Sequence, residues 1–293
     1  ITVPDWITHA ATAIVLKRTD RKADYRLALL GAVLPDMLMP PRIVFLDMFD
    51  LPARDFLLLS TPYHSPFTMI LVSLAIALFT RNVLVSWGML AAFSVTHLIV
   101  DSFVAHYATY PMLGYPFFLG NITPAFIPFN SPVLYILPAV LAPLLIIIWR
   151  SQRYEPLFTF SLKRIAAAVS VTALTLGMIL LTRTAVLNSE YHYLRFFDDP
   201  KAYEGKRVEF CVSRVVSEVP PKVTEMGQLF TLDTGGRYAL KKDMTVSFDG
   251  VYQNGVIRIK ALGIYEPRFK TVYSILMMLF IAILFARRLI SRP

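Results

Sequence analysis

Long runs of apolar residues alternate with short polar and basic segments along most of the chain. The longest runs cover about residues 64–80, 84–105, 132–149, 164–182 and 271–287. Each run is close to the ~20 residues that an α-helix needs to cross the hydrocarbon core of a membrane. The pattern therefore predicts five membrane-spanning helices.

Two shorter apolar stretches, about residues 5–16 and 26–39, flank a basic loop at residues 17–22. At ~1.5 Å of rise per residue, neither stretch is long enough to cross a ~30 Å hydrocarbon core. We expect them to form a helical hairpin that inserts into one face of the membrane or packs against the other helices.

The chain changes character between residues 188 and 270, where apolar and polar residues alternate over short runs. Turn signals separate these runs at Gly235-Gly236, Asp249-Gly250 and Asn254-Gly255. Alternation with period two and closely spaced turns indicate short β-strands. We predict a small five-stranded barrel of the OB type within residues 190–268.

These patterns together predict the fold class and the domains. The predicted fold is mainly α, a polytopic membrane helix bundle that carries a small OB-like β-barrel outside the cytoplasm. Residues 1–187 form the membrane-embedded helical domain with the polar site, residues 188–270 the barrel, and residues 271–293 a C-terminal transmembrane helix.

Composition supports a membrane protein. Hydrophobic residues make up 56% of the chain and charged residues 17%, with a mean hydropathy of +0.55, whereas about 25% of residues are charged in soluble domains. The net charge of +9 comes from basic residues in short loops between apolar runs, which is a topology signal and argues against nucleic acid as a partner. We expect a multi-pass protein of the cell membrane, with its C-terminus in the cytoplasm and the barrel outside.

Polar side chains interrupt the apolar runs at a few positions. His97 and Asp101 are four residues apart, as are Asp5 and His9, so each pair shares one face of a helix. Such groups are expensive beside hydrocarbon and are a functional-site hypothesis by default. Cys211 is the single cysteine, so any metal must be held by imidazoles and carboxylates. Two alternatives stay open, that Asp5 caps a helix and that His97 and Asp101 join two helices structurally.

The order of these motifs resembles the membrane-bound metal-dependent hydrolase family of the LexA-regulated type, which is similar to the zinc-dependent phospholipase C group. The resemblance covers residues 1–131 and rests on Asp5-x-x-Thr8-His9, Gly31-Ala32-Val33-Leu34-Pro35-Asp36, His64-Ser65, His97-x-x-x-Asp101 and a proline-aromatic stretch ending in Pro128-Phe129. It implies that a divalent metal, zinc first and manganese second, is bound by His9, Asp36, His64, His97 and Asp101, with Asp5 as a ligand or an orienting carboxylate. Two positions depart from the family: Leu38 replaces a second acidic residue, and Leu59-Ser60 replaces a His-Arg pair.

Two functions fit this sequence. The first is a membrane hydrolase that cleaves an ester or phosphoester of a lipid or lipid-linked substrate at the outer leaflet, with Asp5 or Asp101 as the base. The second is a non-enzymatic scaffold, in which the metal is structural and the barrel binds a partner protein. The uncharged, aromatic segment 107–131 fits an interfacial belt or a lid over the site.

Overall fold

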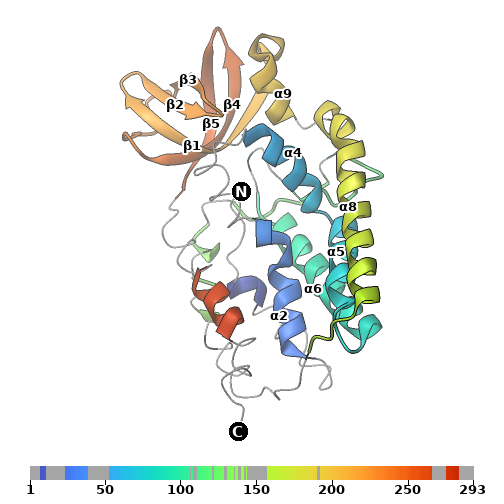
Figure 1. Ribbon diagram of the computed structural model, residues 1–293. Coiled ribbons are helices and arrows are strands. Elements are labelled where there is room, and N and C mark those ends of the chain that lie inside the picture. Colours follow the sequence, from blue (N-terminus) through green and yellow to red (C-terminus); the bar gives the residue numbers. More distant parts are fainter. Residues whose placement is uncertain are drawn as a thin grey trace.

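A computed structural model of the chain places a closed β-barrel at one end of a helical body (Figure 1). It describes residues 7–10, 24–38, 53–105, 107, 111–120, 122–128, 131–134, 136–137, 140–141, 143, 157–189, 192–265 and 275–283. Five α-helices and a short 3-10 helix make up the named elements of the described helical body: α2 (Tyr25–Val33), η1 (Leu34–Leu38), α4 (Ala53–Tyr63), α5 (Pro66–Ala77), α6 (Val83–Ser102) and α8 (Leu162–Asn188).

Helix α6 is the centre of the helical body, because both α2 and α5 pack against it, and α8 packs on α5. The closest approach is at Gly31 of α2, where an added Cβ would lie 2.8 Å from the carbonyl oxygen of Leu90 on α6. The Ser94 hydroxyl of α6 donates to the Gly31 carbonyl at 2.9 Å. A glycine at this position therefore brings the C-terminal carbonyls of α2 directly over α6.

The predicted polytopic helix bundle is wrong. Among the described residues, only α6 and α8 are long and apolar enough to cross a membrane. The predicted span 64–80 shortens to the 12-residue α5, and the described residues cover only parts of the predicted spans 132–149 and 271–287. An apolar run by itself does not distinguish a spanning helix from a helix that packs inside a protein.

Polar groups at both ends explain why α5 is short. Ser65 caps its first turn by accepting from the Thr68 amide at 3.3 Å. At the other end, the Thr80 hydroxyl donates to the Ala77 carbonyl at 2.7 Å, and the Arg164 guanidinium donates to the Leu78 carbonyl at 3.2 Å. These bonds satisfy carbonyls that a longer helix would use itself.

The five strands form the closed barrel that the sequence predicts. They are β1 (Arg207–Glu218), β2 (Pro221–Glu225), β3 (Gln228–Asp233), β4 (Thr245–Gln253) and β5 (Val256–Tyr265), in the order β1-β2-β3-β5-β4. Neighbouring strands are antiparallel except β3 and β5, which are parallel. This is the order of an OB-type barrel.

The turn signals of the barrel have two different outcomes. Asn254 and Gly255 both have positive φ, 52° and 79°, and join β4 to β5 in a tight hairpin, as Asn-Gly predicts. The predicted turn at Asp249-Gly250 is wrong, because Gly250 lies inside β4. An added Cβ at Gly250 would lie 2.5 Å from the carbonyl oxygen of Arg258 on β5, so glycine here allows close pairing of strands.

The barrel core continues into the helical body. Helix α9 (His192–Asp198) is followed by η2 (Pro200–Tyr203). It inserts Phe196 among the core aromatic rings, with the ring centroids of Phe196 and Phe210 5.6 Å apart. The same apolar cluster includes Tyr115 and Val186 from the helical side. The barrel is thus packed on the helices through a shared core, and the predicted boundary at residue 188 stays a prediction.

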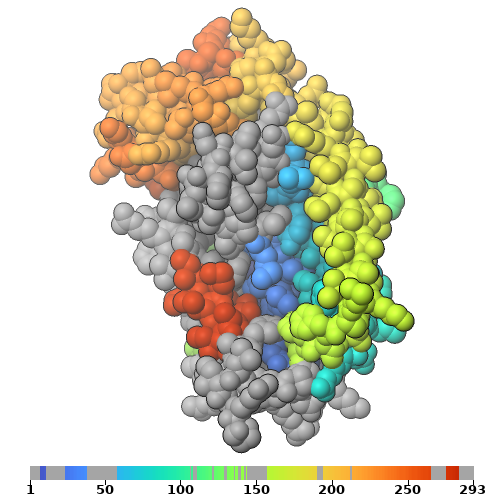
Figure 2. Space-filling model, in the orientation of Figure 1, coloured from blue at the N-terminus to red at the C-terminus, as the bar shows by residue number. Residues whose placement is uncertain are grey.

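Helix α8 lies along the outside of the body (Figure 2). Its surface is apolar: Leu181 is 85% exposed and Val169 is 62% exposed. A helix with such a surface requires an apolar environment or a covering partner.

Candidate metal centre

Asp101, in the last turn of α6, is the centre of a buried polar cluster. Its Oδ2 lies 3.0 Å from His64 Nε2 and 3.1 Å from His97 Nε2, and its Oδ1 lies 3.1 Å from His9 Nε2. The Asp101 side chain has no exposed surface. One carboxylate therefore contacts three imidazoles that come from separate parts of the chain.

Helix α6 supplies two members of the cluster because His97 and Asp101 are one helical turn apart. Both side chains are fully buried. The position of α6 is fixed by its contact with α2 at Gly31. The same contact brings the Ala32 carbonyl oxygen to 2.5 Å from His97 Nδ1.

Asp36 reaches the cluster because α2 ends just before Pro35 and the chain continues as η1. Proline lacks the amide hydrogen that a continuing helix needs. Asp36 Oδ1 lies 3.8 Å from His97 Nε2, and its side chain is 3% exposed.

His64 lies in the turn between α4 and α5, where its amide donates to the carbonyls of Ser60 and Thr61 at 3.1 Å. Its carbonyl accepts from the Met112 amide at 3.1 Å, which ties the turn to the segment after α6. The His64 side chain is 13% exposed, against 3% or less for Asp36, His97 and Asp101. His64 therefore marks the side from which a ligand can approach.

The hydrogen bond of His97 leaves its second ring nitrogen available as a metal ligand. A carbonyl oxygen only accepts hydrogen bonds, so Nδ1 carries the proton that is shared with Ala32. Nε2 makes no hydrogen bond among the described residues, although it lies 3.1 Å from an oxygen of Asp101 and 3.8 Å from an oxygen of Asp36. A nitrogen lone pair that faces two carboxylates is unfavourable unless a positive charge lies among them, and either a bound metal ion or a proton on Nε2 would supply that charge.

The distances also fit a metal ion. The ligand atoms of Asp36, His64, His97 and Asp101 all lie within 4.8 Å of one another. Two ligands bound at ~2.0–2.1 Å to one tetrahedral ion lie about 3.3 Å apart, and the closest contacts in the cluster bracket this value. This buried group can hold a metal ion.

His9 lies at the edge of this four-residue group. Its ring stacks on the His97 ring, with centroids 3.6 Å apart and planes 15° apart, and its Nε2 contacts the Asp101 oxygen that faces away from His64. The structure thus brings all five resemblance-implied ligands together, with His9 positioned to orient Asp101. Asp5 lies outside the described residues, so its role stays a prediction.

Sequence reasoning missed Tyr63 and Ser94. The Tyr63 hydroxyl donates to the Leu34 carbonyl at 3.1 Å, so it holds η1 beside the cluster. Burial, and then the charge of Asp36, raise the pKa of Tyr63, which keeps its hydroxyl protonated as a donor. Ser94 carried a signal, because it lies three residues before His97 on the same helix face.

Comparisons of the chain with family models, with curated proteins and with solved structures give no match.

Proposed function

We propose that this protein is a membrane-bound, metal-dependent hydrolase that cleaves an ester or phosphoester of a lipid or lipid-linked substrate. The observation that carries the proposal is the buried cluster in which His97 Nε2 faces two carboxylates. Mixed nitrogen and oxygen ligands of this kind suit zinc, with manganese as the second choice.

The side chains of the cluster have different roles in this proposal. Asp36, His64, His97 and Asp101 would hold a zinc ion, which would supply Lewis acidity and lower the pKa of bound water toward neutrality. His97 is oriented by the Ala32 carbonyl, and Asp101 is held between His9 and His64. His64, at the more exposed edge, faces an arriving ester. Asp101 is the candidate base, and His9, which contacts its Oδ1, is the imidazole that can relay the proton.

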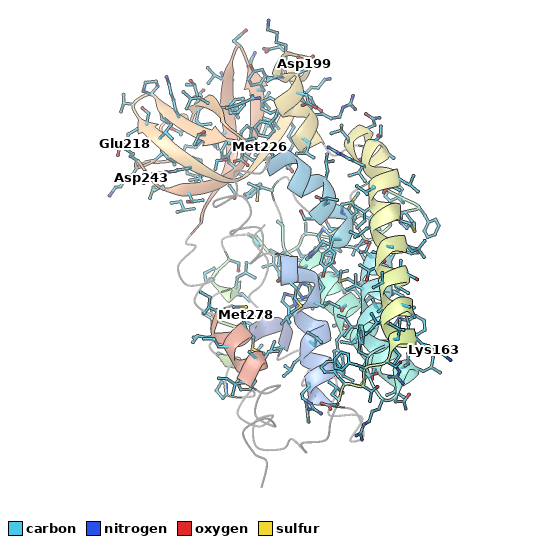
Figure 3. The ribbon with its side chains drawn as sticks, viewed as in Figure 1. Lys163, Asp199, Glu218, Met226, Asp243 and Met278 are labelled. Carbon is cyan, nitrogen blue, oxygen red and sulfur yellow. The ribbon has the colours of Figure 1, made fainter. Side chains whose placement is uncertain are left out.

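The basic residues support a defined orientation in a membrane. Lys163 and Arg164 lie at the start of α8, and Arg81 precedes α6. Figure 3 places Lys163 at the end of the body opposite the barrel, and Asp199, Glu218 and Asp243 on the barrel side. The positive-inside rule counts basic residues in short loops, so the end that carries Arg81, Lys163 and Arg164 is assigned to the cytoplasm in this proposal. The barrel and the C-terminal end of α6, with Asp101, then face outward.

The segment after α6 supports contact with lipid. Phe117 is 89% exposed, Phe126 is 75% exposed and Ile122 is 53% exposed. No charged residue occurs from 102 to 149, so these side chains can enter the headgroup layer without desolvating a charge. His64 is joined to this segment through the Met112 amide, which supports a position of the cluster close to the headgroups.

The test measures metal content and lipid hydrolysis on the purified full chain. We expect about one equivalent of metal by elemental analysis, and metal-dependent release of fatty acid or phosphate from phospholipid vesicles. His97→Ala removes both, whereas Thr96→Ala, a change at the neighbouring position on α6, leaves both intact. Wild-type protein that binds metal but hydrolyses no lipid ester or phosphoester would refute the proposal.

A structural metal site is the second candidate. Four protein ligands within 4.8 Å can fill a tetrahedral zinc site completely, as structural sites do. The barrel, packed on the helices through a shared core, would then bind a partner protein. X-ray absorption at the zinc edge separates the two: four protein ligands and no water favour the scaffold, and a water ligand favours the hydrolase.

A further inference from the structure

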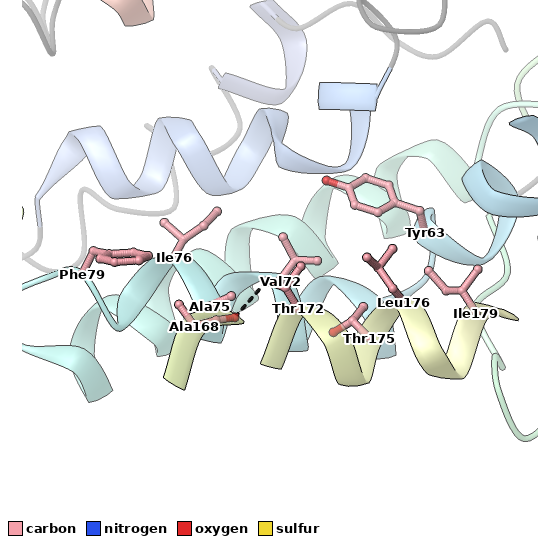
Figure 4. Close-up of a pocket in the computed structure, with 10 residues that line it drawn as sticks. All are labelled: Tyr63, Val72, Ala75, Ile76, Phe79, Ala168, Thr172, Thr175, Leu176 and Ile179. Atoms are coloured by element: carbon pink, nitrogen blue, oxygen red, sulfur yellow. Dashed lines mark hydrogen bonds between the residues drawn. The ribbon is translucent and has the colours of Figure 1, made fainter. Parts of the chain in front are cut away.

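An apolar cavity of 370 Å³ lies between α5 and α8 (Figure 4). Val72 and Ile76 line it from α5, and Leu176 and Ile179 line it from α8. Two threonines of α8 also line it, but their hydroxyls donate to carbonyls of their own helix, Thr172 to Ala168 at 2.9 Å and Thr175 to Val171 at 2.8 Å. These hydroxyls therefore require no partner from a polar ligand.

The cavity has the length of a lipid chain in one leaflet. Its lining residues on α8 extend from Ala168 to Ile179, which corresponds to about 16 Å at ~1.5 Å per residue. One leaflet of a ~30 Å hydrocarbon core is about 15 Å thick. Ala75 of α5 and Ala168 of α8 contribute only methyl groups to the walls, which leaves the space open.

Tyr63 connects one end of the cavity to the buried cluster. Tyr63 lines that end, and His64 is the next residue in the chain. In Figure 4 the Tyr63 side chain extends away from α8, and its hydroxyl donates to the carbonyl of Leu34, the first residue of η1. η1 also carries Asp36. The same tyrosine thus contacts the apolar cavity and the segment that holds one of the buried carboxylates.

We propose that this cavity binds the acyl chain of the lipid whose ester or phosphoester bond is cleaved at the cluster. The inference rests on the proposed hydrolase and specifies its substrate as a long-chain lipid. An acyl chain matches the cavity in its lack of polar groups and in its length, and a chain that ends at Tyr63 brings its headgroup linkage toward His64. The preference for long chains then follows from the apolar area that the chain buries.

Photolabelling tests the location of the chain. Full-length protein is placed in vesicles with a phosphatidylcholine that carries a diazirine on one acyl chain, and the labelled peptides are mapped. We expect labels on the cavity-lining residues of α5 and α8. Ala168→Phe fills the cavity and should lower this labelling about fivefold or more, since an overfilled site rejects its occupant. Val169→Phe, on the exposed face of α8, should leave it unchanged.

Two further measurements keep the outcome interpretable. Metal content reports whether Ala168→Phe folds, and Ala75→Leu offers a smaller filling from the opposite wall. In hydrolysis assays, either filling variant should lower the ratio of kcat/KM for long-chain over short-chain lipids about tenfold. Labelling that is the same in Ala168→Phe and Val169→Phe would overturn the acyl-chain site.

The two proposals fail in different ways. If the wild type hydrolyses no lipid while the labelling responds to Ala168→Phe as expected, the hydrolase is wrong and the acyl-chain site stands. If hydrolysis depends on metal but neither labelling nor chain-length preference responds to the filling variants, the hydrolase stands and the acyl-chain site is wrong.

Discussion

The β-barrel and the candidate metal cluster are stabilised in opposite ways. The barrel buries aromatic rings such as Phe210 and Phe248, which stack with centroids 4.8 Å apart, and two-residue turns join β1 to β2, β2 to β3 and β4 to β5. The cluster buries carboxylates and imidazoles, which is unfavourable without a cation. Stability in the barrel is therefore a matter of apolar area, whereas in the cluster it depends on charge compensation.

Asp101→Asn should have the largest effect on the cluster. Replacing one carboxylate oxygen by an amide NH2 group removes the charge that three imidazoles surround. Metal affinity should therefore fall about 100-fold or more. Competition with a fluorescent chelator measures this affinity. The matched control is Asp243→Asn in the exposed pair with Arg214 on the barrel, which should leave metal affinity unchanged. Equal affinities in the two variants would contradict metal ligation by Asp101.

Phe248→Ala should show the opposite behaviour. Phe248 is fully buried in the barrel core, so its truncation should cost about 3–5 kcal/mol of unfolding free energy. The folded fraction should still bind metal at the wild-type stoichiometry. Urea unfolding followed by circular dichroism measures the loss, with Leu229→Ala, on a 57% exposed side chain of β3, expected to stay within about 0.5 kcal/mol. Loss of metal in folded Phe248→Ala would show that the two regions are not energetically separate.

Gly31→Ala should have an intermediate effect, because a change in the packing of α2 on α6 also moves a group that contacts the cluster. The new Cβ meets the Leu90 carbonyl oxygen at 2.8 Å, so α2 must shift, at a cost of about 1–3 kcal/mol. The shift moves the Ala32 carbonyl away from His97 and should weaken metal binding about tenfold. Gly88→Ala on α6, where an added Cβ meets nothing within 4 Å, should be neutral or stabilising by about 0.5–1 kcal/mol. Equal metal affinities in both variants would contradict the orienting role of Ala32.

The smallest expected effect is a pH dependence in the barrel. The Gly235 amide and then the Arg258 guanidinium lower the pKa of Asp233. A lowered folded-state pKa contributes stability above the unfolded value of about 3.9, and this stability is lost as the pH falls through the folded value. Unfolding free energies should therefore differ slightly between wild type and Asp233→Asn at pH 7, and the difference should shrink as the pH falls from 7 to 3. Metal affinity at pH 7 should be the same in wild type and Asp233→Asn. A difference in unfolding free energy that is as large at pH 3 as at pH 7 would contradict the lowered pKa of Asp233.

The barrel could be predicted in outline from the sequence because its signals are local. Strand alternation and the Asn254-Gly255 turn act over a few residues. The error at Asp249-Gly250 has a tertiary cause, since that glycine is required by close approach to β5 and not by a turn.

The helical region was harder to predict. Apolar runs marked where helices occur, but their number as membrane spans was wrong, because length and hydropathy do not show what a helix packs against. The polar ends that shorten α5 involve Arg164, which is 86 residues from its acceptor Leu78. No local pattern reveals such a contact.

The sequence by itself determined the types and spacing of the cluster residues. The pairing of His97 with Asp101 follows from the helical period, and the exclusion of a cysteine site follows from composition. Only the tertiary structure decided that Ala32 orients His97, that His9 lies at the edge of the cluster, and that Tyr63 connects it to an apolar cavity. These facts depend on how closely α2, α5, α6 and α8 approach one another, and side-chain volumes at distant positions such as Gly31 set those distances.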